Sequence, residues 1–128
     1  MKDAAFERLV QEGFERLPAW VREKIRNVAL LVEDEPSTLV RRKERLGPDE
    51  MLLGLYQGVP LTERGENYGV GMTLPDTITL YRRPVEEAAH DEGRDVRDVV
   101  AETIWHEFAH HFGMDEDAVR EREQKRKR

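Results

Sequence analysis

One helical pattern near the C-terminal end constrains the fold of this chain more than any other feature. Residues with apolar surface recur there at helical spacing and form a stripe that one side of a helix would bury: Val96, Val99, Val100, Thr103 and Ile104. Asp95 is a good N-cap for this helix, and Asp98 adds negative charge in its first turn. Gly113 favours the left-handed conformation in which helices commonly end. The pattern therefore predicts a long, half-buried helix between Asp95 and Gly113.

The second half of this helix carries the sequence His106-Glu107-Phe108-Ala109-His110. Residues four apart lie on one face of a helix, so the imidazoles of His106 and His110 can bind a single metal ion. Glu107 is rotated by about 100° from His106, which places its carboxylate beside such an ion. That position suits a base that takes a proton from metal-bound water and delivers it to a leaving amine. The alternative is that both histidines are ordinary polar positions, since short motifs also arise by chance.

A catalytic zinc ion needs a third protein ligand and one position left open for water. A chain reversal at Gly113 would bring the acidic residues that follow it back over the ion. Spacing from the glycine favours Glu116, and Asp115 is the alternative, although Asp115 also suits a helix cap. The chain has no cysteine, so thiolate ligands and disulfides are excluded. The sequence thus predicts a Zn²⁺ site.

Three further side chains are candidates for supporting roles. His111 either polarises a substrate carbonyl or is a surface or core residue like any other. Tyr81 either stabilises an oxyanion or packs inside a strand. Tyr68 is a second oxyanion candidate, but it lies in a glycine-rich segment whose direction the sequence does not determine. His90 is predicted to be solvated.

The other segments predict a small α+β domain. Hydrophobic periodicity and turn residues place helices at residues 2–17, 20–25 and 85–90, and strands at residues 28–32, 52–57 and 77–82. Residues 34–49 are predicted to be a polar loop that holds at most one helical turn. At 128 residues the chain is expected to form one domain, residues 1–128, in which 120–128 are a solvated basic tail.

Composition excludes several classes of partner. The net charge of -6 argues against nucleic-acid binding, which needs a basic face. Acidic residues near the N-terminus argue against a signal peptide, and no apolar run approaches the length of a membrane span. We therefore expect a cytoplasmic protein with no membrane partner. The oligomeric state is left open.

Three blocks of the chain, residues 52–62, 74–84 and 106–117, resemble a known family of small bacterial zincin-like metallopeptidases, described as minimal zincins. The last block is the most specific. The resemblance implies a compact zincin-like core in which a sheet of about three strands packs on the HExxH helix, with an N-terminal helix. It also implies His106 and His110 as metal ligands and Glu107 as the catalytic acid/base. The family's third ligand is an aspartate three residues after the glycine, where this chain has Glu116.

In zincins generally, an edge strand beside the active helix pairs with an extended substrate. By this analogy, residues 77–82 are the candidate edge, and β-augmentation would supply the physical basis. The expected function is peptide-bond hydrolysis by a zinc-activated water, with peptides or extended protein segments as substrates. One alternative is a zinc-bearing binding or regulatory module with little hydrolytic activity. Another is a purely structural zinc site, but Glu107 argues against it because a closed site needs no base.

Overall fold

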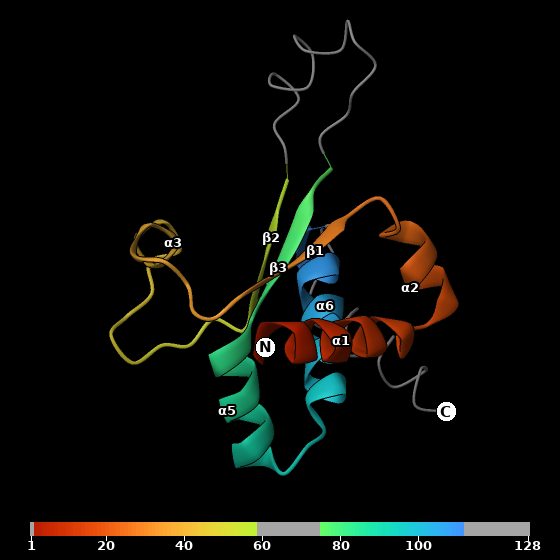
Figure 1. Ribbon diagram of the computed structural model, residues 1–128. Coiled ribbons are helices and arrows are strands. Elements are labelled where there is room, and N and C mark those ends of the chain that lie inside the picture. The colour runs from red at the N-terminus through yellow and green to blue at the C-terminus, as the bar shows by residue number, and fades with distance from the viewer. Residues whose placement is uncertain (1, 59–74, 112–128) are drawn as a thin grey trace, which may run out of the picture.

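The computed structural model describes residues 2–58 and 75–111 and shows a small sheet surrounded by helices (Figure 1). The α+β class and the sheet of three strands, both predicted from the sequence, are confirmed. The elements follow one another as α1 (Lys2–Glu15), α2 (Ala19–Lys24), β1 (Ala29–Glu33), α3 (Thr38–Lys43), β2 (Gly54–Gln57), β3 (Thr77–Tyr81), α5 (Arg82–Glu92) and α6 (Val96–His111).

The sheet has the strand order β1-β3-β2, so β3 is its central strand. β1 runs parallel to β3, with Ala29 opposite Thr77, and β2 runs antiparallel to β3, with Gly54 opposite Leu80. The prediction that residues 77–82 form an edge strand is therefore wrong. The side chains of β3 are buried on both faces of the sheet, since Ile78 is 0% exposed and Thr79 is 2% exposed. Within the described ranges, the two edges of the sheet are β1 and β2.

The core lies between α6, α1 and the sheet. α6 contributes Ile104, Trp105 and Phe108, each at most 3% exposed, and α1, which crosses α6 in Figure 1, contributes Phe6 and Val10. The central strand adds its buried apolar side chains to the same cluster. Burial of these large side chains is the main favourable term in folding. It holds one side of α6 inside the molecule.

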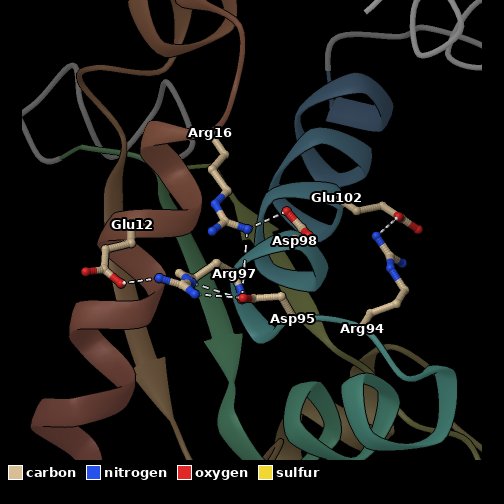
Figure 2. A network of polar contacts seen from close by, with 7 residues as sticks. All are labelled: Glu12, Arg16, Arg94, Asp95, Arg97, Asp98 and Glu102. Atoms are coloured by element: carbon tan, nitrogen blue, oxygen red, sulfur yellow. Dashed lines mark hydrogen bonds and ion pairs between the residues drawn. The ribbon is translucent and has the colours of Figure 1, made fainter. Parts of the chain in front are cut away.

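A network of charged groups fixes the start of α6 against α1 (Figure 2). Asp95 caps the helix as predicted, because its Oδ1 accepts a hydrogen bond of 2.8 Å from the N–H of Arg97. The guanidinium of Arg97 also contacts Asp95 at 2.7 Å, and it reaches Glu12 of α1 at 3.4 Å. Arg16, which directly follows α1, reaches Asp98 at 2.7 Å. Hydrogen bonds from the Arg97 side chain, and then from its backbone N–H, hold the pKa of Asp95 well below its usual range.

Several elements differ from their predicted bounds by one to three residues, and α5 differs most. α5 begins at Arg82, three residues before the predicted start, and Pro84 lies in its first turn. A proline is tolerated there because the first N–H groups of a helix have no intrahelical acceptor. The single helical turn expected in residues 34–49 is the six-residue α3, and Ser37 caps it by accepting from the N–H of Val40.

Within the described part of the chain, no helix has both the length and the apolar character needed to cross a membrane.

Candidate functional site

The last turns of α6 present the two predicted metal ligands together. The ring centroids of His106 and His110 are 6.5 Å apart, and the ring planes differ by 27°. The His106 side chain is 41% exposed, and His110 is exposed as well. Accessible imidazoles one turn apart are donors that zinc prefers. Both imidazoles therefore lie on one accessible side of α6, one turn apart, as their spacing predicts.

Glu107 lies between these histidines in sequence but in a different environment. Its side chain is half-buried, and Oε1 accepts a hydrogen bond of 2.9 Å from the backbone N–H of Tyr56 in β2. Burial raises the pKa of Glu107, and the hydrogen bond from Tyr56 opposes that shift. The carboxylate is thus held in one orientation by a main-chain donor.

The donor comes from the outer edge of β2. The carbonyl of Leu53 accepts from the N–H of Tyr81, so this position faces the central strand. Backbone groups alternate in direction along a strand, so those of Gly54 and Tyr56 point away from β3. The edge of the sheet that carries these outward groups is therefore the one beside the HExxH helix.

Gly54 allows β2 to approach α6 closely. A Cβ atom at this position would lie 2.7 Å from Cγ2 of Thr103 and 3.1 Å from the carbonyl oxygen of Thr79. The first separation is shorter than carbon atoms tolerate without displacement. Glycine is thus a requirement of the spacing that brings the Tyr56 N–H to Glu107.

A cleft of about 230 Å³ opens beside Glu107. α6 forms one wall, which includes His106 and Glu107, and residues 52–54 form another. Glu92, the last residue of α5, and Arg94 also line the cleft, and Arg94 reaches Glu102 at 2.8 Å. The cleft gives a bound molecule access to His106 and to the Glu107 carboxylate at once.

His111 belongs to a second group of contacts beside the histidine pair. Its ring stacks on the ring of Tyr56, with centroids 3.8 Å apart and planes 18° apart. The Tyr56 hydroxyl donates to Oδ2 of Asp76 at 2.8 Å. Tyr56 thus contacts α6 through its ring and through its N–H. The sequence analysis missed Tyr56 and Asp76, because their contacts join positions 51 and 20 residues apart that no local pattern relates.

The remaining candidates fall into two groups. Tyr81 is 2% exposed, and burial raises its pKa, which supports the packing alternative over an oxyanion role. The His90 side chain is 91% exposed, as predicted. Tyr68, Asp115 and Glu116 lie outside the described residues. Among residues 2–58 and 75–111, no group of three or more metal-ligating side chains forms.

Comparison with known protein families gives a match over most of the chain. A model of the family described as zincin-like metallopeptidase matches residues 25–126. No curated protein matches the chain. The match covers most of the sequence, including β1, the β2 edge and the whole HExxH helix. The chain therefore belongs to the zincin-like metallopeptidase family.

Proposed function

We propose that the protein is a zinc-dependent peptidase in which His106 and His110 bind the metal and Glu107 is the general base. The observation that carries the proposal is the hydrogen bond between the Glu107 carboxylate and the Tyr56 N–H. It holds a half-buried carboxylate immediately beside two accessible imidazoles. A purely structural zinc site has no need of a carboxylate oriented in this way. Glu116 is the proposed third ligand, with Asp115 as the alternative.

Zinc, when bound, supplies a Lewis acid that lowers the pKa of a coordinated water to near neutrality. Glu107 would accept a proton at its carboxylate from the water that attacks the scissile carbonyl, and it would pass that proton to the amine that leaves as the C–N bond breaks. The Tyr56 N–H donates to one oxygen of the Glu107 carboxylate. The Glu107 side chain is therefore already ordered before the reaction begins. Burial makes the carboxylate a stronger base than a solvated one, because it raises the pKa of Glu107.

The proposed substrate is a peptide or protein segment in extended conformation. Its backbone would pair with the outer edge of β2, where Gly54 points its N–H and C=O away from the sheet. This edge replaces residues 77–82, which lie at the centre of the sheet. The cleft beside Glu107 begins at the same edge, since Gly54 lines it. Strand pairing would therefore carry the scissile bond past the base.

The test is Glu107→Gln, assayed on a library of linear peptides together with the zinc content of the purified protein. Loss of the base should lower kcat/KM by about 10²-fold or more while zinc remains bound. Glu15→Gln, an exposed carboxylate on α1, is the matched control and should keep full activity. His106→Ala should lose zinc and activity together. Peptides N-methylated on alternate backbone amides should be cleaved more slowly, because they cannot complete a strand pairing.

Two results would contradict the proposal. If Glu107→Gln cleaves peptides as fast as the unaltered protein, Glu107 is not the base. If the zinc-loaded protein cleaves no peptide but binds some of them through the β2 edge, the binding-module alternative replaces the enzyme.

A further inference from the structure

The second edge of the sheet, β1, is separated from β2 by the central strand and has no pairing strand among the described residues. The N–H of Ala29 donates to the carbonyl of Asp76 at the start of β3. By the alternation of a strand, the N–H and C=O groups of Leu30 and Val32 point outward from the sheet. Proteins commonly protect such edges with internal charges or prolines, and the strand Ala29–Glu33 has a charge only at its last residue.

The surroundings of this edge are shaped to receive another strand. A groove of about 540 Å³ runs between the strand and α1, lined by residues 30–33 and by Glu7, Val10 and Gln11. Leu31 is 44% exposed, one of few large apolar side chains on the described surface. Leu30 and Val32 pack against the core on the opposite face of the strand. The β1 edge therefore combines outward backbone groups, the exposed side chain of Leu31 and an adjacent groove.

We infer that β1 is a dimer interface, at which two copies of the chain pair antiparallel about a two-fold axis at Leu31. In this register Leu30 of one copy lies opposite Val32 of the other, so the outward backbone groups form four hydrogen bonds. The two Leu31 side chains meet at a non-hydrogen-bonded position, where facing side chains are closest. The interface is isologous and closes at two copies.

The charges around β1 favour a second copy of the chain as the partner, and they favour antiparallel over parallel pairing. Before the strand, Arg22, Lys24 and Arg26 outnumber Glu23, which pairs with Arg26 at 3.2 Å, while Glu33 ends the strand. Antiparallel pairing places Glu33 opposite Ala29 of the other copy, near that copy's basic end. Parallel pairing would place the two Glu33 carboxylates together, and like charges in that position are unfavourable. Within the paired strands, no charge faces a like charge.

The arrangement is independent of the proposed peptidase function. The dimer would contain a continuous sheet of six strands, β2-β3-β1-β1-β3-β2. Both β2 edges, and with them both copies of Glu107, would lie at the far ends of that sheet. Each cleft would stay accessible in the dimer.

Mass measured by analytical ultracentrifugation from micromolar to near-millimolar concentration tests the inference. We expect a reversible dimer, because an interface of a few strand residues is small. Leu31→Lys places two ammonium groups face to face and should weaken dimerisation by about tenfold or more. Leu39→Lys on α3 is the matched control, since Leu39 is 74% exposed and lies away from the strand, and it should leave the dimer unchanged. Circular dichroism confirms that both variants fold.

Disulfide trapping tests the register. The chain has no cysteine, so Leu31→Cys introduces a single thiol that should form a disulfide-linked dimer under mild oxidation. Leu39→Cys should give background levels only, because it lies outside the interface. Ala29→Cys should do the same, because residue 29 of one copy lies far from residue 29 of the other in this register. A monomer at every concentration overturns the inference. So does a dimer that Leu31→Lys leaves intact, or a Leu31→Cys chain that does not cross-link above the Leu39→Cys background.

Discussion

At the scale of single residues, the site depends on a glycine as much as on its charged groups. Gly54 leaves room for Thr103 where a methyl group would lie 2.7 Å from Cγ2. The distance between β2 and α6 therefore follows from the absence of one side chain. The same spacing sets the hydrogen bond between Tyr56 and Glu107.

Gly54→Ala should destabilise the protein by about 1–3 kcal/mol, because the added methyl group overpacks the contact with α6. Thr103→Ser removes Cγ2 and keeps the hydroxyl that donates to the carbonyl of Val99 at 2.8 Å. Combined with Gly54→Ala, it should recover much of the lost stability. Chemical denaturation of the two single variants and the double variant measures this coupling. Additive effects would show that the contact with Cγ2 does not limit the spacing.

Residue-level prediction from the sequence succeeded where the relation is local. His106 and His110 share a helix, and helical spacing places their rings on one face without reference to the rest of the fold. Tyr56 and Asp76 were missed because they join the site through pairings between distant segments. The same distinction applies to Tyr81, whose role depends on what packs around β3 rather than on its neighbours in sequence.

At the scale of elements, the position of α6 depends on the charged groups at its start. The ion pairs of Arg97 and Arg16 connect the first turn of this helix with α1 (Figure 2). Since the pKa of Asp95 is depressed in the folded protein, its ionised form contributes stability. That contribution is complete above the unfolded carboxyl pKa of about 4. It is lost as the pH falls through the lower folded value.

Asp95→Asn keeps a side-chain oxygen for the helix cap and removes the charge. It should therefore lower the Tm at pH 7, and the difference from the unaltered protein should shrink steadily below about pH 4. Thermal unfolding of both proteins between pH 7 and pH 2 measures the effect. Asp49→Asn, in an exposed loop, is the control and should show a much smaller difference at pH 7. A Tm difference that stays constant across this range would mean that the charge of Asp95 does not contribute.

The helices and strands themselves were largely predictable, but which elements lie next to one another in space was not. Caps and hydrophobic periodicity are local signals, so the prediction included Asp95 as the cap and the buried stripe of α6. Which strand lies at the centre depends on pairing across the chain, which the sequence does not display locally. The prediction of residues 77–82 as an edge strand failed for this reason, because β1 and β2 pair with β3 on its two sides.

At the scale of the whole molecule, the core and the proposed metal site occupy different sides of α6. Trp105 and Phe108 are buried, and Trp20 packs against Trp105 with ring centroids 5.6 Å apart. His106 and His110 lie on the accessible side. The core is therefore formed by apolar contacts that do not involve the ligand histidines.

Removal of zinc by a chelator should abolish hydrolysis and leave the fold intact. The Tm should fall by roughly 5–15 °C, because a ligand that binds only the folded state adds stability by mass action. Circular dichroism and near-ultraviolet spectra, before and after chelation, report the fold while activity is followed in parallel. Unfolding of the zinc-free protein at room temperature would instead support a structural role for the metal.

The anchor of Glu107 is part of the main chain, and this affects how the site tolerates genetic change. Nineteen of the 20 genetically encoded amino acids carry the N–H that Tyr56 donates, and only proline lacks it. Substitutions at position 56 alter the ring and the hydroxyl but leave this donor in place. The orientation of the Glu107 carboxylate therefore depends on the course of the backbone at residue 56 and not on the side chain there. Most substitutions at position 56 should leave that orientation unchanged.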